Sequence, residues 1–528
     1  KVDTDVVLRS IDLLNCLAST NYYAEAISGS VTGGVSNVSV SGSIAMIFGF
    51  NDIQALIGDG CTINVAGDFK LATTVGTNTR MIAGALSAGT SKIAVGTSIG
   101  SYVDEDTAVA RIGTGTVGAK KTKVHAGGSV GVESTGDNDA LVIVVAPAVG
   151  PDSTVSVGAT IAVIYMDNAI DAAITDGCEI TGDAGVAVVA QNTSKLLPIT
   201  VSVADSGGVA VGGTLQIIID KTATRAHVGD DVTIKAVNGP ITVAALSSNE
   251  FIDVLASASV SSATKGSAAV AAVLNVIVSR SDTEATVGER STLAAKGSYL
   301  VKGVVTPASV NVKAESEDFM VSATFALGAG KVAVGAEVNV FVFDRDVLAQ
   351  VGKGSKVSAE LGDVIVRANA MDYAVVVSIG ASGGSNTAVS GTIPVIVSLN
   401  RVLALIGTYV DDPADTSEAK TLLDATGTSL VSAHGSVGVI SDYKSDLYAA
   451  AGAISGSGSA AVGATILTIV VENDVHALVG TGAFLAAGGG GTGMDVPGQS
   501  SKRKGVSIVA HSAETYLAAA ISGAAAGN

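Results

Sequence analysis

The sequence predicts an all-β fold, a right-handed parallel β-helix, and three observations support this prediction. The phrase Ala-x-(Ile or Val)-Gly recurs at the equivalent position of seven repeats, and an eighth copy ends in Thr175 instead of Gly. A small residue preceded by Val lies 17 positions before each phrase end, as Ser41 lies before Gly58. Gly accounts for 64 of the 528 residues, Trp is absent and aromatic residues make up 4%, a composition typical of narrow β-structure with frequent corners. Such a repeat indicates one elongated body that grows by stacking, not several separate domains.

Each repeat has parts that recur in a fixed order. An alternating apolar run leads from the small residue to the phrase, and a period-2 segment such as Val310–Ala314 or Val364–Ala368 follows. Alternation of this kind predicts a half-buried strand. The shortest repeat, from Thr175 to Gly229, divides into three coils of about 18 residues, a length typical of β-helix coils. We therefore expect about eight repeats of roughly 54–73 residues, with roughly three coils each.

The third residue of every phrase is Ile or Val, although its neighbours vary. A position that keeps an aliphatic side chain in every copy is expected to face the core. We therefore predict one inward-facing structural column. Its members are Ile57, Ile112, Ile174, Val228, Val287, Val351, Ile406 and Val479.

The repeat also predicts the domain organisation. Residues 1–20 are the least periodic part and are expected to form an irregular N-terminal segment, whereas residues 21–528 form a single continuous solenoid. The length of the repeat varies mainly between the phrase and the period-2 strand, so corner loops are expected at about 289–307, 408–434 and 481–503. Insertions at one corner project from one face, and we expect these three loops on the same lateral face.

Aromatic residues recur shortly after the period-2 strand, among them Phe251, Phe319 and Tyr373. Stacked rings usually fill the interior of a solenoid. We therefore expect this aromatic column to pack inside the body.

Charge and hydropathy exclude two classes of partner. The net charge is −18 and the isoelectric point about 4.6, whereas nucleic-acid binding requires clustered Lys and Arg. The mean hydropathy is +0.51, but the longest apolar runs are shorter than the ~20 residues of a spanning helix. We expect neither a nucleic-acid partner nor a membrane span.

The titratable residues predict no enzyme. Five His are scattered along the chain, and His-x-x-x-His, Cys-x-x-Cys and Gly-x-Ser-x-Gly are absent from the sequence, so no residue is assigned a catalytic or cofactor-binding role. Calcium is the one metal for which the sequence offers candidate ligands, namely Asp411, Asp412 and Asp495 in acidic or Gly-rich turns. A calcium site of the repeat type needs ligands from adjacent turns, and the Gly-rich turn before Asp495 occurs once. We therefore expect no cofactor.

The pattern from Ser41 to Ala510 resembles the repeats of large bacterial exoproteins of the filamentous-haemagglutinin and leukotoxin kind. Segments such as Val157–Val163 and Val462–Ile466 carry the resemblance, because a small-residue Val-Gly-Ala strand leads into the Ala-x-Ile-Gly corner. The resemblance implies a secreted or surface-displayed right-handed β-helix with an adhesive, matrix or toxin role. It transfers no catalytic residue.

We therefore expect a non-enzymatic extracellular structural or adhesive protein that forms a stalk, fibre or filament at the bacterial surface. The alternatives are a secreted leukotoxin-like cytotoxin and a polysaccharide-active β-helix enzyme. The expected partners are further copies or repeats of the chain, a host or neighbouring-cell surface, or carbohydrate.

The two ends suggest assembly. The first repeat begins partway through, near Tyr22 and Tyr23, and the last stops partway, near Tyr516 and Ile521. A terminal coil without a polar cap exposes unpaired backbone groups that another strand can pair with. We expect these ends to associate head to tail into an open filament or to belong to a longer array.

Overall fold

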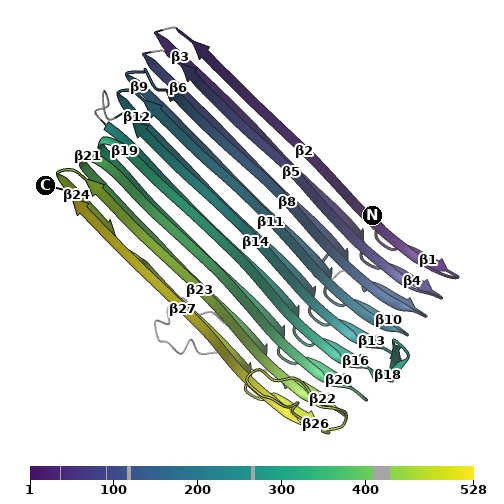
Figure 1. Ribbon diagram of the computed structural model, residues 1–528. Coiled ribbons are helices and arrows are strands. Elements are labelled where there is room, and N and C mark those ends of the chain that lie inside the picture. Colours follow the sequence, from purple (N-terminus) through teal and green to yellow (C-terminus); the bar gives the residue numbers. More distant parts are fainter. Residues whose placement is uncertain (36, 91, 116–119, 263–267, 408–427, 528) are drawn as a thin grey trace.

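The computed structural model describes residues 1–35, 37–90, 92–115, 120–262, 268–407 and 428–527. These residues form an all-β structure with parallel strands, as the sequence predicts, and none of the described segments is helical. The strands belong to two large parallel sheets and one small antiparallel hairpin (Figure 1). The hairpin consists of β17 (Ser298–Val301) and β18 (Val304–Pro307).

The smaller parallel sheet contains nine strands of four residues each. In order of pairing they are β1 (Val7–Ser10), β4 (Thr62–Val65), β7 (Lys123–Ala126), β10 (Glu179–Gly182), β13 (Thr233–Ala236), β16 (Thr292–Ala295), β20 (Lys356–Ala359), β22 (Leu430–Ala433) and β26 (Phe484–Ala487).

The larger parallel sheet folds over on itself, so that it forms two facing walls. The first wall contains β2 (Leu14–Gly34), β5 (Phe69–Gly89), β8 (Ser129–Gly150), β11 (Gly185–Ser206), β14 (Ile241–Ser261), β23 (Val437–Ser457), β27 (Val506–Ala526) and the N-terminal halves of β19 (Val310–Val351) and β21 (Val364–Ile406). The second wall contains β3 (Val38–Ile57), β6 (Ile93–Ile112), β9 (Val155–Ile174), β12 (Val209–Val228), β15 (Ala268–Val287), β24 (Ala460–Thr465), β25 (Thr468–Val479) and the C-terminal halves of β19 and β21. Because β19 and β21 run through both walls, the walls belong to one sheet.

Each repeat contributes one layer of the stack. Equivalent residues of successive repeats pair directly, as Ile112 pairs with both Ile57 and Ile174. A layer consists of one short strand, one strand of the first wall and one strand of the second wall. The prediction of roughly three coils in each repeat is therefore wrong. A strand of 20 residues spans about 66 Å at 3.3 Å per residue. The two long strands and the short strand of one layer therefore contain most of the residues of one repeat, and the chain passes around the body once in each repeat.

The prediction that residues 1–20 are irregular is also wrong. They form β1 and the first part of β2. Val7 pairs with Thr62 in β4 and Leu14 pairs with Phe69 in β5, both in parallel register. The segment lacks a visible repeat because its outward positions mix polar and apolar residues, but its backbone pairs like that of later layers.

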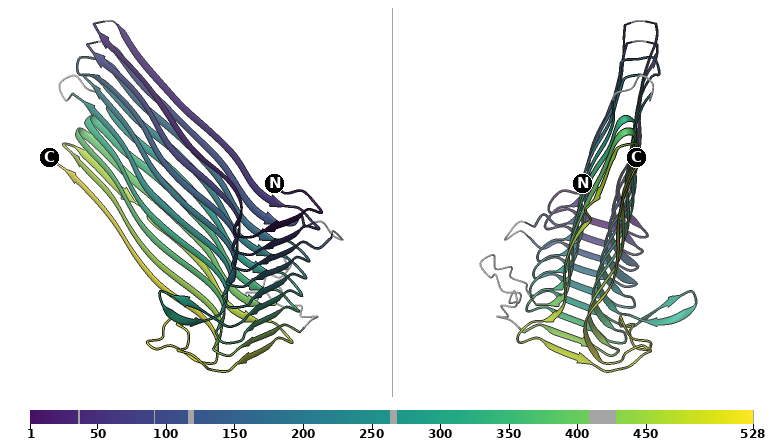
Figure 2. Two further views of the ribbon diagram at one scale, coloured as in Figure 1. Left: turned by 90° about the vertical axis from the view of Figure 1, so that its right-hand side faces the viewer. Right: turned by 60° about the vertical axis from the view of Figure 1, so that its left-hand side comes forward.

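The two walls approach each other closely at the end far from the short strands, and Figure 2 shows this thin part edge-on. We call it the blade; it runs from Val38 to Phe50 in β3 and through the paired residues of the other layers. The small residue that precedes each phrase by 17 positions points inward here. A Cβ on Gly158 would lie 2.3 Å from the carbonyl oxygen of Val203 in the first wall. Gly158 therefore leaves no room for a side chain between the walls, and the equivalent residues of the other layers are Gly, Ala or Ser.

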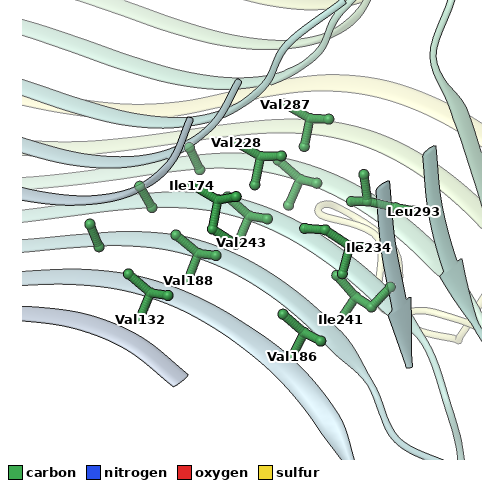
Figure 3. Packing of buried hydrophobic residues seen from close by; sticks show 14 of the residues in the cluster. Val132, Ile174, Val186, Val188, Val228, Ile234, Ile241, Val243, Val287 and Leu293 are labelled. Atoms are coloured by element: carbon green, nitrogen blue, oxygen red, sulfur yellow. The ribbon is translucent and has the colours of Figure 1, made fainter. Parts of the chain in front are cut away.

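The main hydrophobic core lies at the wide end, between the walls and the short strands. Val132 and Val188 of the first wall, Val228 of the second wall and Ile234 of the small sheet point toward one another there (Figure 3). All are fully buried. The apolar residues of the three strands in each layer thus meet in one continuous core.

The aromatic residues do not share one environment. Phe251 is buried, but Phe319 and Tyr373 lie on the outer surface of the first wall, each 38% exposed. Their rings stack with centroids 5.3 Å apart. The interior placement expected for the aromatic column is wrong for Phe319 and Tyr373, because Phe319 pairs with Glu250 and not with Phe251. A shift of one residue turns a side chain to the opposite face of a strand.

The corner insertions occupy two different corners. Those at 289–307 and 481–503 continue beyond β16 and β26, between a short strand and the first wall. The insertion at 408–434 precedes and includes β22, between the second wall and a short strand, and its residues 408–427 lie outside the described residues. The insertions at 289–307 and 481–503 share one corner, as predicted, whereas a common lateral face for all three loops stays a prediction because residues 408–427 lie outside the described residues. Within the described part of the chain, no helix is long and apolar enough to cross a membrane.

Candidate functional site

The eight aliphatic residues of the phrase lie in one row of the second wall. Each pairs with its equivalent in the next layer, from Ile57 at one end to Val479 at the other. The seven residues from Ile57 to Ile406 are 0–1% exposed, and Val479, in the last layer, is partly buried. Figure 3 shows Ile174, Val228 and Val287 of this row pointing into the core. The row packs the second wall against the short strands.

A buried charge cluster connects the two walls above this core. Arg345 in the second wall forms ion pairs with Asp318 and Asp372 in the first wall. Its Nε lies 3.1 Å from Oδ1 of Asp372 and donates a hydrogen bond to Oδ2 of Asp318. The Tyr443 hydroxyl donates to Oδ2 of Asp372 at 2.8 Å, and the Asn400 amide donates to the Tyr443 hydroxyl at 2.7 Å. All five groups are held by strands on opposite sides of the interior.

The electrostatics of the cluster follow from its burial. Burial alone would lower the pKa of Arg345, but the carboxylates of Asp318 and Asp372 raise it above its ordinary value, so the guanidinium stays charged. Burial raises the pKa of Asp372, and Arg345 opposes this rise. The free space beside the cluster measures ≈ 30 Å³, room for about one water molecule. The cluster therefore cross-links the walls from within.

Asp253, Asp220 and Asp104 are further buried aspartates inside the walls. Asp253 accepts hydrogen bonds from Gln216 at 2.6 Å, Asn275 at 2.7 Å and Ser322 at 2.8 Å, yet burial raises its pKa to about 6. Burial raises the pKa of Asp220 to about 7, and the pKa of Asp104 also to about 7. The ordinary value is about 4. These carboxyl groups therefore hold a proton in the folded chain at pH values where the unfolded chain has released it.

We expect the stability of the protein to fall as the pH rises from about 4 to about 7. In this window the folded state binds more protons than the unfolded state, so the free energy of unfolding decreases by about 1.4 kcal/mol per pH unit for each such group. Urea unfolding followed at pH 4 to 8 measures this slope. Most proteins lose stability toward acid, and such a loss here would contradict the assignment.

Replacing Asp220 with Asn tests the contribution of one of these buried carboxyl groups to the pH dependence of stability. Asp220→Asn should raise the free energy of unfolding at pH 8 and change it little at pH 4, because Asn carries no charge and its oxygen can still accept from Ser279 at 3.2 Å. Asp167→Asn is the matched control, since Asp167 lies in the neighbouring strand β9 with its side chain 44% exposed. An equal effect of both variants would show that burial is not the cause.

The calcium candidates are not brought together in the described part of the chain. Asp411 and Asp412 lie outside the described residues. The side chain of Asp495 is 77% exposed and lies 3.4 Å from the Lys502 ammonium. Among the described residues, no group of three or more His, Cys, Asp or Glu side chains is placed to hold a metal ion.

The two end layers carry open sheet edges. At one end β2 and β3 each pair along one side only, with β5 and β6, and at the other end β27 pairs only with β23. Tyr22 is partly buried on β2, and Tyr23, 56% exposed, donates to Glu25 at 2.8 Å. Tyr516 and Ile521 lie on β27, 39% and 67% exposed. All four residues named from the sequence thus lie on edge strands.

Sequence reasoning missed the buried charge cluster and the polar interior of the blade. The available signal was the recurrence of Ser, Thr, Asn and Asp at alternate positions of the second-wall strands, as in Asp104 and Asp106 or Ser279 and Ser281. These positions point inward and are buried. The pattern does not identify these polar residues as inward-facing, because apolar residues normally take the inward positions of a half-buried strand.

Searches with the sequence and the structure found no match to a family model, a curated protein or a solved structure.

Proposed function

We propose that the chain is the body of a right-handed parallel β-solenoid that serves as a non-enzymatic structural and adhesive protein. In this proposal it forms a stalk, fibre or filament on the surface of a bacterial cell. The observation that supports it best is the direct parallel pairing of equivalent residues from eight successive repeats. The extracellular location and the adhesive role rest on the resemblance to large bacterial exoproteins.

The proposal explains why the 17-residue spacing is the same in all eight copies of the repeat. In a stack of layers, each repeat buries its apolar face against its neighbours, so length can increase without a new core. The short strands, the first wall and the second wall all advance by one strand per repeat. Such a body is suited to bridging a distance and to presenting its corner loops at regular intervals.

The open edges supply a means of lengthening. The backbone N–H of Gly527 donates to the carbonyl of Ser457 in β23 at 2.9 Å. Successive N–H groups of a strand point to opposite sides, and Ala520 lies an odd number of residues before Gly527. The N–H of Ala520 therefore points away from β23, toward the open side of β27. A further layer, from the same chain or from a second copy, would accept this hydrogen bond.

We expect the isolated chain to associate end to end. Its mass, followed by light scattering, should rise with concentration, and electron microscopy should show rods of variable length. Ala520→Pro removes one N–H from the open side of β27, which an edge strand tolerates, and should shorten the rods. Ala520→Val keeps the N–H and is the matched control. A concentration-independent monomer would overturn the proposed end-to-end assembly.

A further inference from the structure

The outer surface of the second wall is apolar where the blade is thinnest. We call this surface the β3–β25 face; it consists of the outward residues of β3, β6, β9, β12, β15, β24, β25 and the C-terminal halves of β19 and β21. One row across it is Val in all eight layers: Val40, Val95, Val157, Val211, Val270, Val334, Val389 and Val462. A second row is aliphatic in every layer for which pairing is continuous: Ile44, Ile99, Ile161, Leu215, Leu274, Val338 and Ile393.

The blade therefore reverses the usual distribution of polar and apolar residues. Between the outward residues, inward ones such as Ser98, Thr160 and Thr214 are buried, whereas Ile161 and Leu274 are 36% and 41% exposed. Monomeric soluble proteins rarely expose a contiguous apolar patch of more than a few hundred Å². This face must contact something other than water.

The size of the face matches a protein interface. From Val40 to Phe48 the strand rises about 26 Å, and seven steps between eight layers span about 34 Å, so the band measures about 900 Å². A stable complex of standard size buries about 800 Å² on each partner. None of the outward residues of this band is charged.

The relief of the face is self-complementary. Between the Val row and the aliphatic row lies a row of small residues, with Gly42, Ala159, Gly213 and Ala336 among its members. A two-fold axis along the rows, midway between the small and the aliphatic row, places the aliphatic row of each copy over the small row of its partner. The same operation is that of an isologous dimer, in which one surface patch contacts its own copy.

The charges lie where the rim of such an interface would be. The outward row beyond Phe48 includes Glu105, Asp167, Lys221 and Arg280. The two-fold operation places this row opposite the turns at the far end of the partner's blade, in contact with solvent. An apolar centre with a polar rim is the usual anatomy of an interface.

We propose that the β3–β25 face is an interface between two copies of this chain, packed face to face through their blades. A lipid bilayer would also cover apolar side chains, but a fluid hydrocarbon surface does not account for rows of large and small residues that match their own copy, or for an area close to that of one side of a standard interface. This lateral pairing is independent of end-to-end growth, because the face lies on the flank of the stack and the growing edges lie at its ends.

The test uses the full chain with Ala520→Pro, which weakens end-to-end growth at β27, at concentrations too low for rods to form. Sedimentation equilibrium should give the mass of two chains, and Leu274→Glu should return it to one, with a dissociation constant at least tenfold larger. Arg280→Glu is the matched control on the same strand, in the charged row, and should leave the mass at two chains. Leu274 and Arg280 are both exposed and β15 is not an edge strand, so circular dichroism and urea midpoints should agree for the two variants. Ile161→Gln provides a second, uncharged change if Leu274→Glu fails to fold.

Three outcomes would overturn the proposal. One is a monomer at every concentration before any face residue is changed. Another is an unchanged mass in both folded face variants. The third is flotation with phosphatidylcholine vesicles that Leu274→Glu abolishes, which would identify lipid as the occupant. Rod formation by the chain without Ala520→Pro is scored separately, so failure of lateral pairing and failure of end-to-end growth are distinguishable.

Discussion

Replacing Val351 with Asp is expected to lower the free energy of unfolding by about 3–5 kcal/mol. Val351 is fully buried and pairs with Val287 on one side and Ile406 on the other. The variant loses the packing of an aliphatic side chain and places an unpaired carboxylate among the apolar side chains of the main core. Urea unfolding at pH 7 measures the loss.

Gln350→Asp is the control for this prediction. Gln350 is adjacent in β19 but points outward, and its amide donates to the carbonyl of Gly407 at 3.0 Å. Gln350→Asp introduces the same charge but removes only the hydrogen bond to Gly407. We therefore expect the free energy of unfolding to fall by only about 1 kcal/mol. If both variants lose the same stability, the inward row does not carry the core.

The row that contains Val351 could be predicted from the sequence because two constraints coincide there. The repeat brings equivalent residues into register, and a position that stays aliphatic in every copy must face the core. The same argument predicted strands, parallel pairing and the absence of separate domains. It needs only the spacing of residues along the chain.

The number of circuits in each repeat could not be predicted in the same way. A period of two residues identifies strands but not where a strand ends, and the turns between the walls are short. Val31 and Val38 belong to different walls, for example, yet few residues separate β2 from β3. Dividing the repeat by the usual coil length therefore gave three coils where the chain makes one circuit with very long strands.

The sequence also does not show which of the two alternating sets of side chains in a strand faces the interior. Alternation divides a strand into two sets, and the apolar set normally faces the core. In the blade the opposite holds: Val40 is 57% exposed and Ser41 is 2% exposed. The spacing of the walls decides this, because branched side chains do not fit where a Cβ on Gly158 would contact the opposite backbone. That spacing is a tertiary property.

The charge cluster shows a third limit. Asp318 and Arg345 belong to the same strand, 27 residues apart, and meet only because β19 folds over from the first wall to the second. No local motif relates them. Their juxtaposition depends on the position of the turn within β19, which the sequence pattern does not reveal.

Replacing Arg345 with Met is expected to lower the free energy of unfolding at pH 7 by about 3–5 kcal/mol, because breaking a buried ion pair leaves uncompensated charge. Arg345 is 7% exposed and Asp318 and Asp372 are each 8% exposed, so water cannot replace the lost guanidinium. Met fills similar space near Phe343, whose ring lies 5.2 Å from the Arg345 guanidinium carbon. The loss should therefore be electrostatic, not steric.

Two further measurements separate this cause from a packing defect. Adding Asp318→Asn and Asp372→Asn to Arg345→Met removes both charges and should recover most of the lost stability, as neutral replacements of buried ion pairs often do. The loss in Arg345→Met alone should also shrink as the pH falls toward about 4, because removal of the cation leaves the folded-state pKa of Asp372 above its unfolded value, and protonation then favours the folded state. A loss that is the same at pH 4 and pH 7, and that the two Asn substitutions do not reduce, would mean that Arg345 acts by filling space. Electrostatic cross-linking of the walls predicts both recoveries, since each removes the same buried negative charge.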